Sequence, residues 1–214
     1  MGHQICTVDH YEQNNRGMKT IIFSSLTLLG FSAAAQQTAQ SLPADVLIKI
    51  AVMAAPEEKQ ADAAVYGYSA SGDFVTLREG TNDFVCLAPD MRQDGSTLQA
   101  FAYPKSLDPF MARGRELTEQ GKAAERDSIR EAEIRAGKLH MPQGPSTLYG
   151  YSGDRAGLNP QTGEINGAKR RYVIYVPYAM AADLGLSNKP AAPGMPWLMD
   201  EGSYKAHIMI TPKQ

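Results

Sequence analysis

The chain has 214 residues, which is enough for one domain or for two small ones. Apolar residues make up 43% and charged residues 21%, close to the average of folded globular proteins, so most of the chain should bury a core. The formal net charge is −2. A chain so close to neutral offers no basic surface for DNA, RNA or anionic lipid, and nucleic acid is therefore disfavoured as a partner.

The strongest feature lies near the N-terminus. Lys19 precedes an apolar run over residues 21–31, and the small residues 32–35 form an A-x-A cleavage site. This order predicts a Sec-type signal peptide over residues 18–35 rather than a buried core helix. The run is shorter than the roughly 20 apolar residues of a bilayer span. We therefore expect a soluble, exported protein, periplasmic or secreted, with no membrane span after signal cleavage.

The flanks of this segment divide the chain. Residues 1–17 lack a periodic apolar face, and we interpret them as a doubtful leader or a start placed too early. Residues 36–42 are polar and form a tether. Residues 43–214 are expected to fold as a single α+β domain.

In chain order, an apolar stripe at helical spacing predicts a helix near residues 43–54. Residues 65–87 alternate short apolar runs with glycine- and asparagine-containing turns, which predicts an antiparallel meander. Residues 104–137 have helical spacing, with an apolar face at the start and many charges afterwards. Glu131 and Arg135 are correctly ordered for an i,i+4 ion pair on a solvated helix face, although the charges also suit a partner groove.

Further strands are expected at residues 147–151, 172–176 and 207–210. The segment 172–176 is apolar on both faces, which favours a central strand. The sequence thus predicts an α+β fold in which a mostly antiparallel sheet packs against two or three helices.

Cys86 is the only cysteine that follows the signal segment, so it has no partner for an intrachain disulfide. It lies in the apolar run 84–87. That setting favours a buried, inert thiol, with a reactive nucleophile as the alternative.

Three blocks resemble a group of uncharacterised exported bacterial proteins. Residues 77–87 match its REGTN…C segment, residues 196–202 with 206–209 match its PW-M…G…AHIM ending, and residues 109–117 look like a segment of its closer members. The resemblance covers most of the chain after the signal segment. It implies export and a shared fold but no activity. Relatives often carry a second cysteine where this chain has Ala102.

A catalytic hypothesis centres on His207, because an imidazole exchanges protons near neutral pH. Asp200 or Glu201 would orient the imidazole, and Cys86 would supply a nucleophile. The alternative is a structural histidine at the start of a strand.

Copper is the metal hypothesis. His207 and Met209 would share one face of a strand, and Met195 and Met199 lie nearby in the sequence. Methionine at an apolar position is also a common core residue. No other cofactor is expected.

Trp197 lies between Met195 and Met199 in a proline-rich stretch. These residues suit an apolar ligand groove or a protein-binding surface, and equally the end of a core. We therefore expect a non-catalytic envelope or secreted domain that binds a small apolar ligand or a protein. The alternatives are an envelope hydrolase that uses His207 with a carboxylate or Cys86, and a structural envelope protein.

Overall fold

The computed structural model describes residues 42–93 and 95–213. The predicted leader, signal peptide and nearly all of the tether lie outside these residues. The strands are β1 (Ala64–Tyr68), β2 (Phe74–Arg78), β3 (Phe84–Leu87), β4 (Thr97–Pro104), β5 (Ser146–Asp154), β6 (Lys169–Tyr175), β7 (Trp197–Met199) and β8 (His207–Ile210). The helices are α1 (Ala44–Val52), α2 (Glu57–Gln60), α3 (Asp108–Glu119), α4 (Arg126–Arg135) and α5 (Ala181–Leu184).

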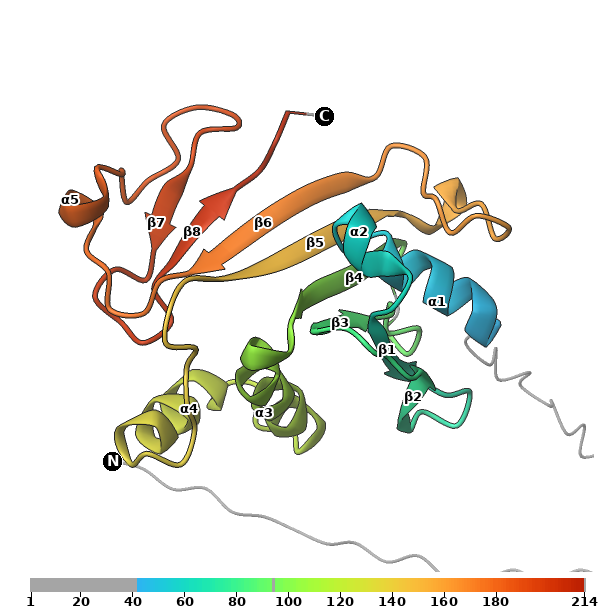
Figure 1. The fold of residues 1–214 in the computed structure, drawn as a ribbon, viewed down its shortest axis with the longest axis horizontal. Coiled ribbons are helices and arrows are strands. Elements are labelled where there is room, and N and C mark those ends of the chain that lie inside the picture. The colour runs from blue at the N-terminus through green and yellow to red at the C-terminus, as the bar shows by residue number, and fades with distance from the viewer. Residues whose placement is uncertain (1–41, 94, 214) are drawn as a thin grey trace, which may run out of the picture. The chain divides into compact units, whose positions relative to one another are not determined.

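One eight-stranded sheet contains all these strands, in the order β2-β1-β3-β4-β5-β6-β8-β7 (Figure 1). Every neighbouring pair is antiparallel except β1 and β3. The α+β class and the mostly antiparallel sheet are therefore as predicted, but the sheet is larger than expected and five helices accompany it.

The first three strands differ from the predicted meander. β3 pairs with β1 in parallel, on the side of β1 that β2 leaves free. The turn after β2 causes this arrangement, because the backbone amides of Thr81 and Asn82 both donate to the carbonyl oxygen of Asp62. These bonds hold the start of β3 beside the residues that lead into β1.

The sequence does not predict β4 and β7, and the reason differs for each strand. Besides Leu98 and Tyr103, β4 buries the two small residues Ala100 and Ala102 at its centre, so the strand has a weak apolar signature. β7 has only three residues in a proline-rich stretch. The helical segment 104–137 is likewise interrupted, because Gly121 adopts a φ of +73° between α3 and α4.

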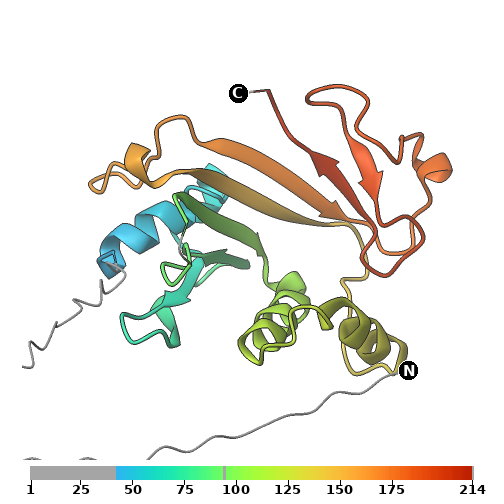
Figure 2. The ribbon, with the colours of Figure 1, turned by 180° about the vertical axis from the view of Figure 1, so that it is seen from behind.

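Helices cover both faces of the sheet (Figures 1 and 2). On one face, α1 buries Leu47 and Ile50 against residues of β1, β3, β4 and β5. On the opposite face, Leu107 and Phe110 pack at the start of α3 against Val85, Tyr103 and Leu148. We call these the α1 face and the α3 face. No helix among the described residues is long and apolar enough to cross a membrane.

The strands β6, β8 and β7 extend beyond these helices in Figure 1, and we call them the C-terminal sheet end. All four residues of β8 are half-buried, as are the last four of β6. Apolar side chains on this part of the sheet therefore stay partly accessible.

Candidate functional site

The C-terminal sheet end carries most of the residues that the sequence analysis selected. His207, Met209, Trp197 and Met199 lie on its last two strands, and Asp200 lies in the loop between them. Met195, just before β7, is 53% exposed. The site is therefore built from one hairpin and its connections.

His207 is held by the loop that precedes β8. Its Nδ1 lies 2.8 Å from the carbonyl oxygen of Lys205, and because a carbonyl only accepts, Nδ1 carries the proton. The ring also contacts Tyr175, with centroids 5.7 Å apart. Asp200 Oδ2 is 3.8 Å from Nδ1. The backbone carbonyl, rather than this carboxylate, therefore orients the imidazole.

The carboxylate of Asp200 faces a competing cation, because Lys205 Nζ is 3.5 Å away. The backbone of Asp200 has a φ of +53°, which is rare for a residue with a side chain. Glu201 does not act on His207 in this arrangement, since its carboxylate accepts a hydrogen bond from the backbone amide of Ala181. The structure thus brings His207 and Asp200 within 3.8 Å of each other, but it shows no hydrogen bond between them.

A polar network that the sequence analysis missed connects this loop to α4. Lys205 Nζ donates to Asp127 at 2.7 Å, and Arg130 donates to the same carboxylate at 3.0 Å. Burial opposes the ionisation of Asp127, but these hydrogen bonds outweigh it and lower the pKa of the carboxyl to about 2. The hydrogen bond to Asp127 also raises the pKa of Lys205.

Arg130 is the buried member of this network, only 7% exposed. Its guanidinium stacks on the ring of Phe110 at 4.0 Å, and that ring packs edge-on against Tyr175 and Tyr204. In the sequence, α4 is marked only by the run of charges in 116–135. That pattern does not show that Arg130 is buried while its charged neighbours are solvated.

Cys86 lies away from this site. It belongs to the cluster under α1, whereas His207 pairs with Tyr175 of the opposite face. The two strands are four positions apart in the sheet, which corresponds to roughly 19 Å. Burial also raises the pKa of the Cys86 thiol to about 12. A Cys86–His207 pair is therefore not formed, and the hydrolase hypothesis loses its thiol nucleophile.

Trp197 and its neighbours lie on the α3 face. Trp197 pairs with Met209, and Met199 pairs with His207. The sheet register assigns Phe84 and Tyr149, whose rings are 6.0 Å apart, to the α1 face. Trp197 therefore does not share an apolar pocket with those rings, and it is half-buried rather than closing the core.

The longest connection at this end, between β6 and β7, exposes large apolar side chains. Tyr178, Met180 and Leu184 are exposed together with Met195, and Tyr178 has a φ of +64°. This conformation is fixed by the amide of Tyr178, which donates to the carbonyl oxygen of Ser203. The loop that contains these exposed residues is therefore held to the β7–β8 loop by a backbone hydrogen bond.

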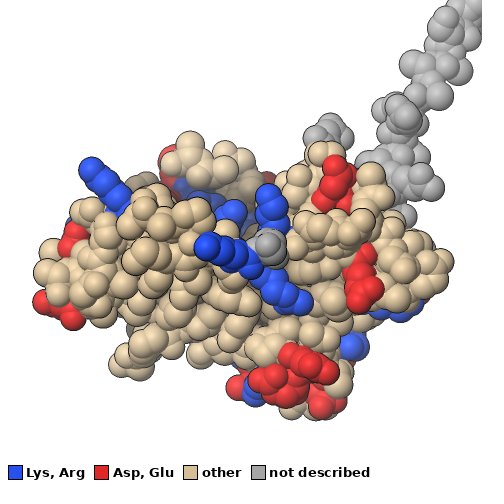
Figure 3. Space-filling view, turned by 90° about the horizontal axis from the view of Figure 1, so that it is seen from above, with Lys and Arg blue, Asp and Glu red and all other residues tan. Residues whose placement is uncertain are grey.

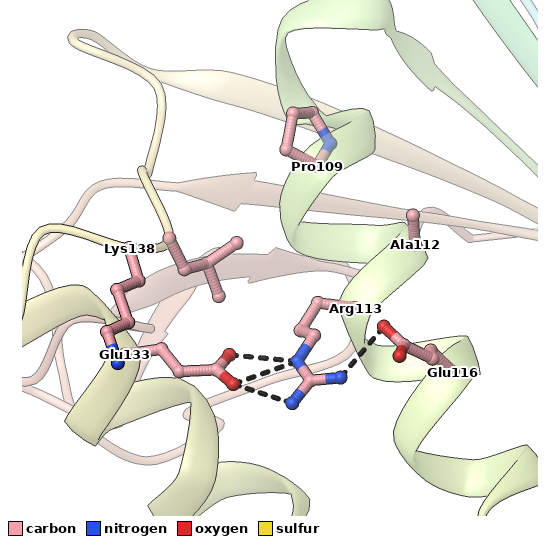
Figure 4. A pocket seen from close by; sticks show the side chains of 7 residues that line it. Pro109, Ala112, Arg113, Glu116, Glu133 and Lys138 are labelled. Atoms are coloured by element: carbon pink, nitrogen blue, oxygen red, sulfur yellow. Dashed lines mark hydrogen bonds and ion pairs between the residues drawn. The ribbon is translucent and has the colours of Figure 1, made fainter.

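Two surface hollows lie elsewhere. One lies between α3 and α4, where Arg113 reaches Glu133 at 2.6 Å and Glu116 at 2.8 Å (Figure 4). The other lies beside Tyr151 and Arg170. In the first hollow, Arg113 is already paired with two carboxylates. In the second, Arg170 already donates to the carbonyl oxygen of Met53. Both arginines therefore have partners within the protein.

The REGTN block has a structural role. Arg78 donates to the carbonyl oxygens of Gln60 and Ala63, and the Asn82 amide donates to that of Lys59. The Asn82 side-chain oxygen in turn accepts from the amide of Phe84. This part of the resemblance thus concerns the junction of β1, β2 and β3, whereas the PW-M…AHIM ending forms the β7–β8 hairpin.

No protein-family model matches the chain, and neither a curated protein nor a solved structure matches it. Among the described residues, no group of three histidine, cysteine or acidic side chains is arranged to hold a metal ion.

Proposed function

We propose that this chain is an exported, non-catalytic domain that binds another protein through the loop beside its C-terminal sheet end. One observation carries the proposal: four of the five large apolar side chains that are exposed in the described residues lie within positions 178–195. All four belong to the connection between β6 and β7, and a concentration of exposed apolar side chains, unlike single scattered ones, is typical of interaction surfaces.

The charge distribution supports the same surface. In Figure 3 a broad area in the left half of the view carries few Lys, Arg, Asp and Glu side chains, and those present lie along its left edge. The centres of protein interfaces are depleted of charged residues and rich in tyrosine and methionine. Tyr178 and Met180 fit that composition.

The backbone at Tyr178 supports a preformed surface. A bulky residue at positive φ costs about 1–3 kcal/mol and persists only where its surroundings fix it. The bonds from Tyr178 to Ser203 and from Gly202 to Ala179 supply that restraint. A surface that is ordered before binding loses less entropy on association.

A protein suits this surface better than a small apolar ligand. Small ligands bind in concave, mostly apolar pockets that bury most of their area. The two described hollows are instead lined by charged residues such as Arg113 and Arg170, and neither includes Trp197. Export is supported by the signal-like segment 18–35 and by the resemblance to exported proteins.

Site-specific photo-crosslinking in the producing cells tests the proposal. A benzophenone amino acid in place of Tyr178 should give one adduct of defined mass, in the fraction that contains exported proteins. Adding Leu184→Glu to the same chain should remove the adduct, because a charge would enter the apolar contact.

Phe74 provides a matched control position. It is also an exposed aromatic residue, 42% accessible, but it lies on β2 at the other edge of the sheet. The probe at Phe74 should give no such adduct. Equal labelling from both positions, or no adduct from Tyr178, would overturn the proposal.

A further inference from the structure

Four side chains on the β7–β8 hairpin lie together on the α3 face of the sheet. His207 pairs directly with Met199, and Met209 pairs directly with Trp197. His207 and Met209 are two residues apart on one strand, so they point to the same side. The hairpin therefore forms a rectangle of one imidazole, two thioethers and one indole.

The dimensions of this rectangle suit a single bound atom. Directly paired residues in an antiparallel ladder have Cα atoms about 5 Å apart, and residues i and i+2 on one strand are about 7 Å apart. The flexible methionine side chains span such distances. All four residues are half-buried, and neither apolar cluster of the described residues includes Met199, Met209 or Trp197.

The hydrogen bond of His207 leaves its second ring nitrogen for a metal. Because Nδ1–H of His207 donates to the carbonyl oxygen of Lys205, Nε2 is the ring nitrogen that can bind a metal. Metal-binding histidines are commonly oriented by such a bond from their second nitrogen to a backbone carbonyl.

We propose that His207, Met199 and Met209 bind one Cu(I) ion. Thioethers are soft ligands that select Cu(I), and imidazole also suits copper, whereas calcium and magnesium need oxygen ligands. The ring of Trp197 beside Met209 would face the cation and shield it from water. This site stands independently of the proposed protein-binding loop.

Trp197 provides a direct reporter, because it is the single tryptophan of the chain. The full chain with Cys6→Ser is titrated without oxygen with Cu(I), and separately with the redox-inert ion Ag(I), in the presence of a competing chelator. One equivalent of either ion should quench the tryptophan fluorescence to saturation. Zinc and calcium should leave it unchanged.

Ligand variants distinguish this site from adventitious binding. Met199→Leu and Met209→Leu keep the side-chain volume, and each should weaken Cu(I) binding by more than about tenfold. His207→Gln should do the same. Met180→Leu, at an exposed methionine outside the rectangle, should leave the affinity unchanged.

Two results would overturn the proposal: no saturable quenching by Cu(I) or Ag(I), or quenching that persists in Met199→Leu/Met209→Leu. Circular dichroism of each variant establishes that it is folded. Since crosslinking from Tyr178 needs no metal, that experiment can fail while the metal titration succeeds, and the reverse also holds.

Discussion

The carboxylate of Asp127, in the first turn of α4, accepts a hydrogen bond from Lys205 at 2.7 Å, across 78 positions of the chain. The Tyr204 hydroxyl adds a second bond, to the backbone carbonyl of Asp127, at 2.9 Å. These contacts join α4 to the residues that lead into β8. The helix thereby supports the loop that orients His207.

Asp127→Asn should lower the free energy of unfolding by about 1–2 kcal/mol, because it removes the negative charge that faces the buried Arg130. The loss stays this small because the side chain of Asp127 is itself 42% exposed, so water screens its interaction with Arg130. Urea unfolding of the two proteins measures the difference.

Glu131→Gln on the same helix is the control. Glu131 pairs with Arg135 at 2.6 Å, as the sequence predicts, but both side chains are exposed. Its loss should cost less than about 0.5 kcal/mol. Equal losses in the two variants would contradict the role assigned to Asp127.

The stability of the protein should fall in acid partly because of Asp127. Its folded-state pKa, about 2, lies below the ordinary value of 3.8, so folding favours the ionised form. That contribution is complete above pH 4 or so and is lost as the pH falls toward about 2. The difference in unfolding free energy between wild type and Asp127→Asn should therefore shrink between about pH 6 and pH 2.5. A difference that stays constant would exclude this titration.

The strands with strong apolar alternation could be predicted from the sequence, and those whose residues are small or few could not. The segments 84–87 and 207–210 form strands with the predicted bounds. The pairing of β1 with β3 escaped prediction because it depends on bonds from the 80–82 turn to Asp62, which local patterns do not encode.

The site was predictable only in part for a related reason. The alternation of a strand predicts that His207 and Met209 share a face. Their register against Met199 and Trp197 depends on the hairpin, and β7 was not foreseen. The contribution of Asp127 comes from a helix far away in the sequence, so no spacing rule could reveal it.

Gly80→Ala should destabilise the fold by about 3 kcal/mol or more. A methyl group there would lie 2.0 Å from the backbone nitrogen of Ala64, and backbone cannot move aside as a side chain can. Thermal or urea unfolding measures the loss. Gly144→Ala is the control, because no atom beyond its two chain neighbours lies within 4 Å of the added carbon. If both variants have the same free energy of unfolding, Gly80 does not lie as close to the backbone of Ala64 as the structure indicates.

Cys86 should resist thiol reagents in the native protein. Burial raises the pKa of its thiol to about 12 from 9.0, so at pH 8 the thiolate is about a thousandfold scarcer than in an ordinary cysteine. Absorbance of a disulfide reagent, followed in a Cys6→Ser chain, should show slow reaction in buffer and rapid reaction in denaturant.

The control for this experiment adds Lys122→Cys to the same chain. Lys122 is exposed in the turn after α3, so its replacement should react quickly in buffer and give two clearly separated phases. A native Cys86 that reacts as fast as this added thiol would be accessible and ionisable. The interpretation of Cys86 as a buried, inert thiol would then be wrong.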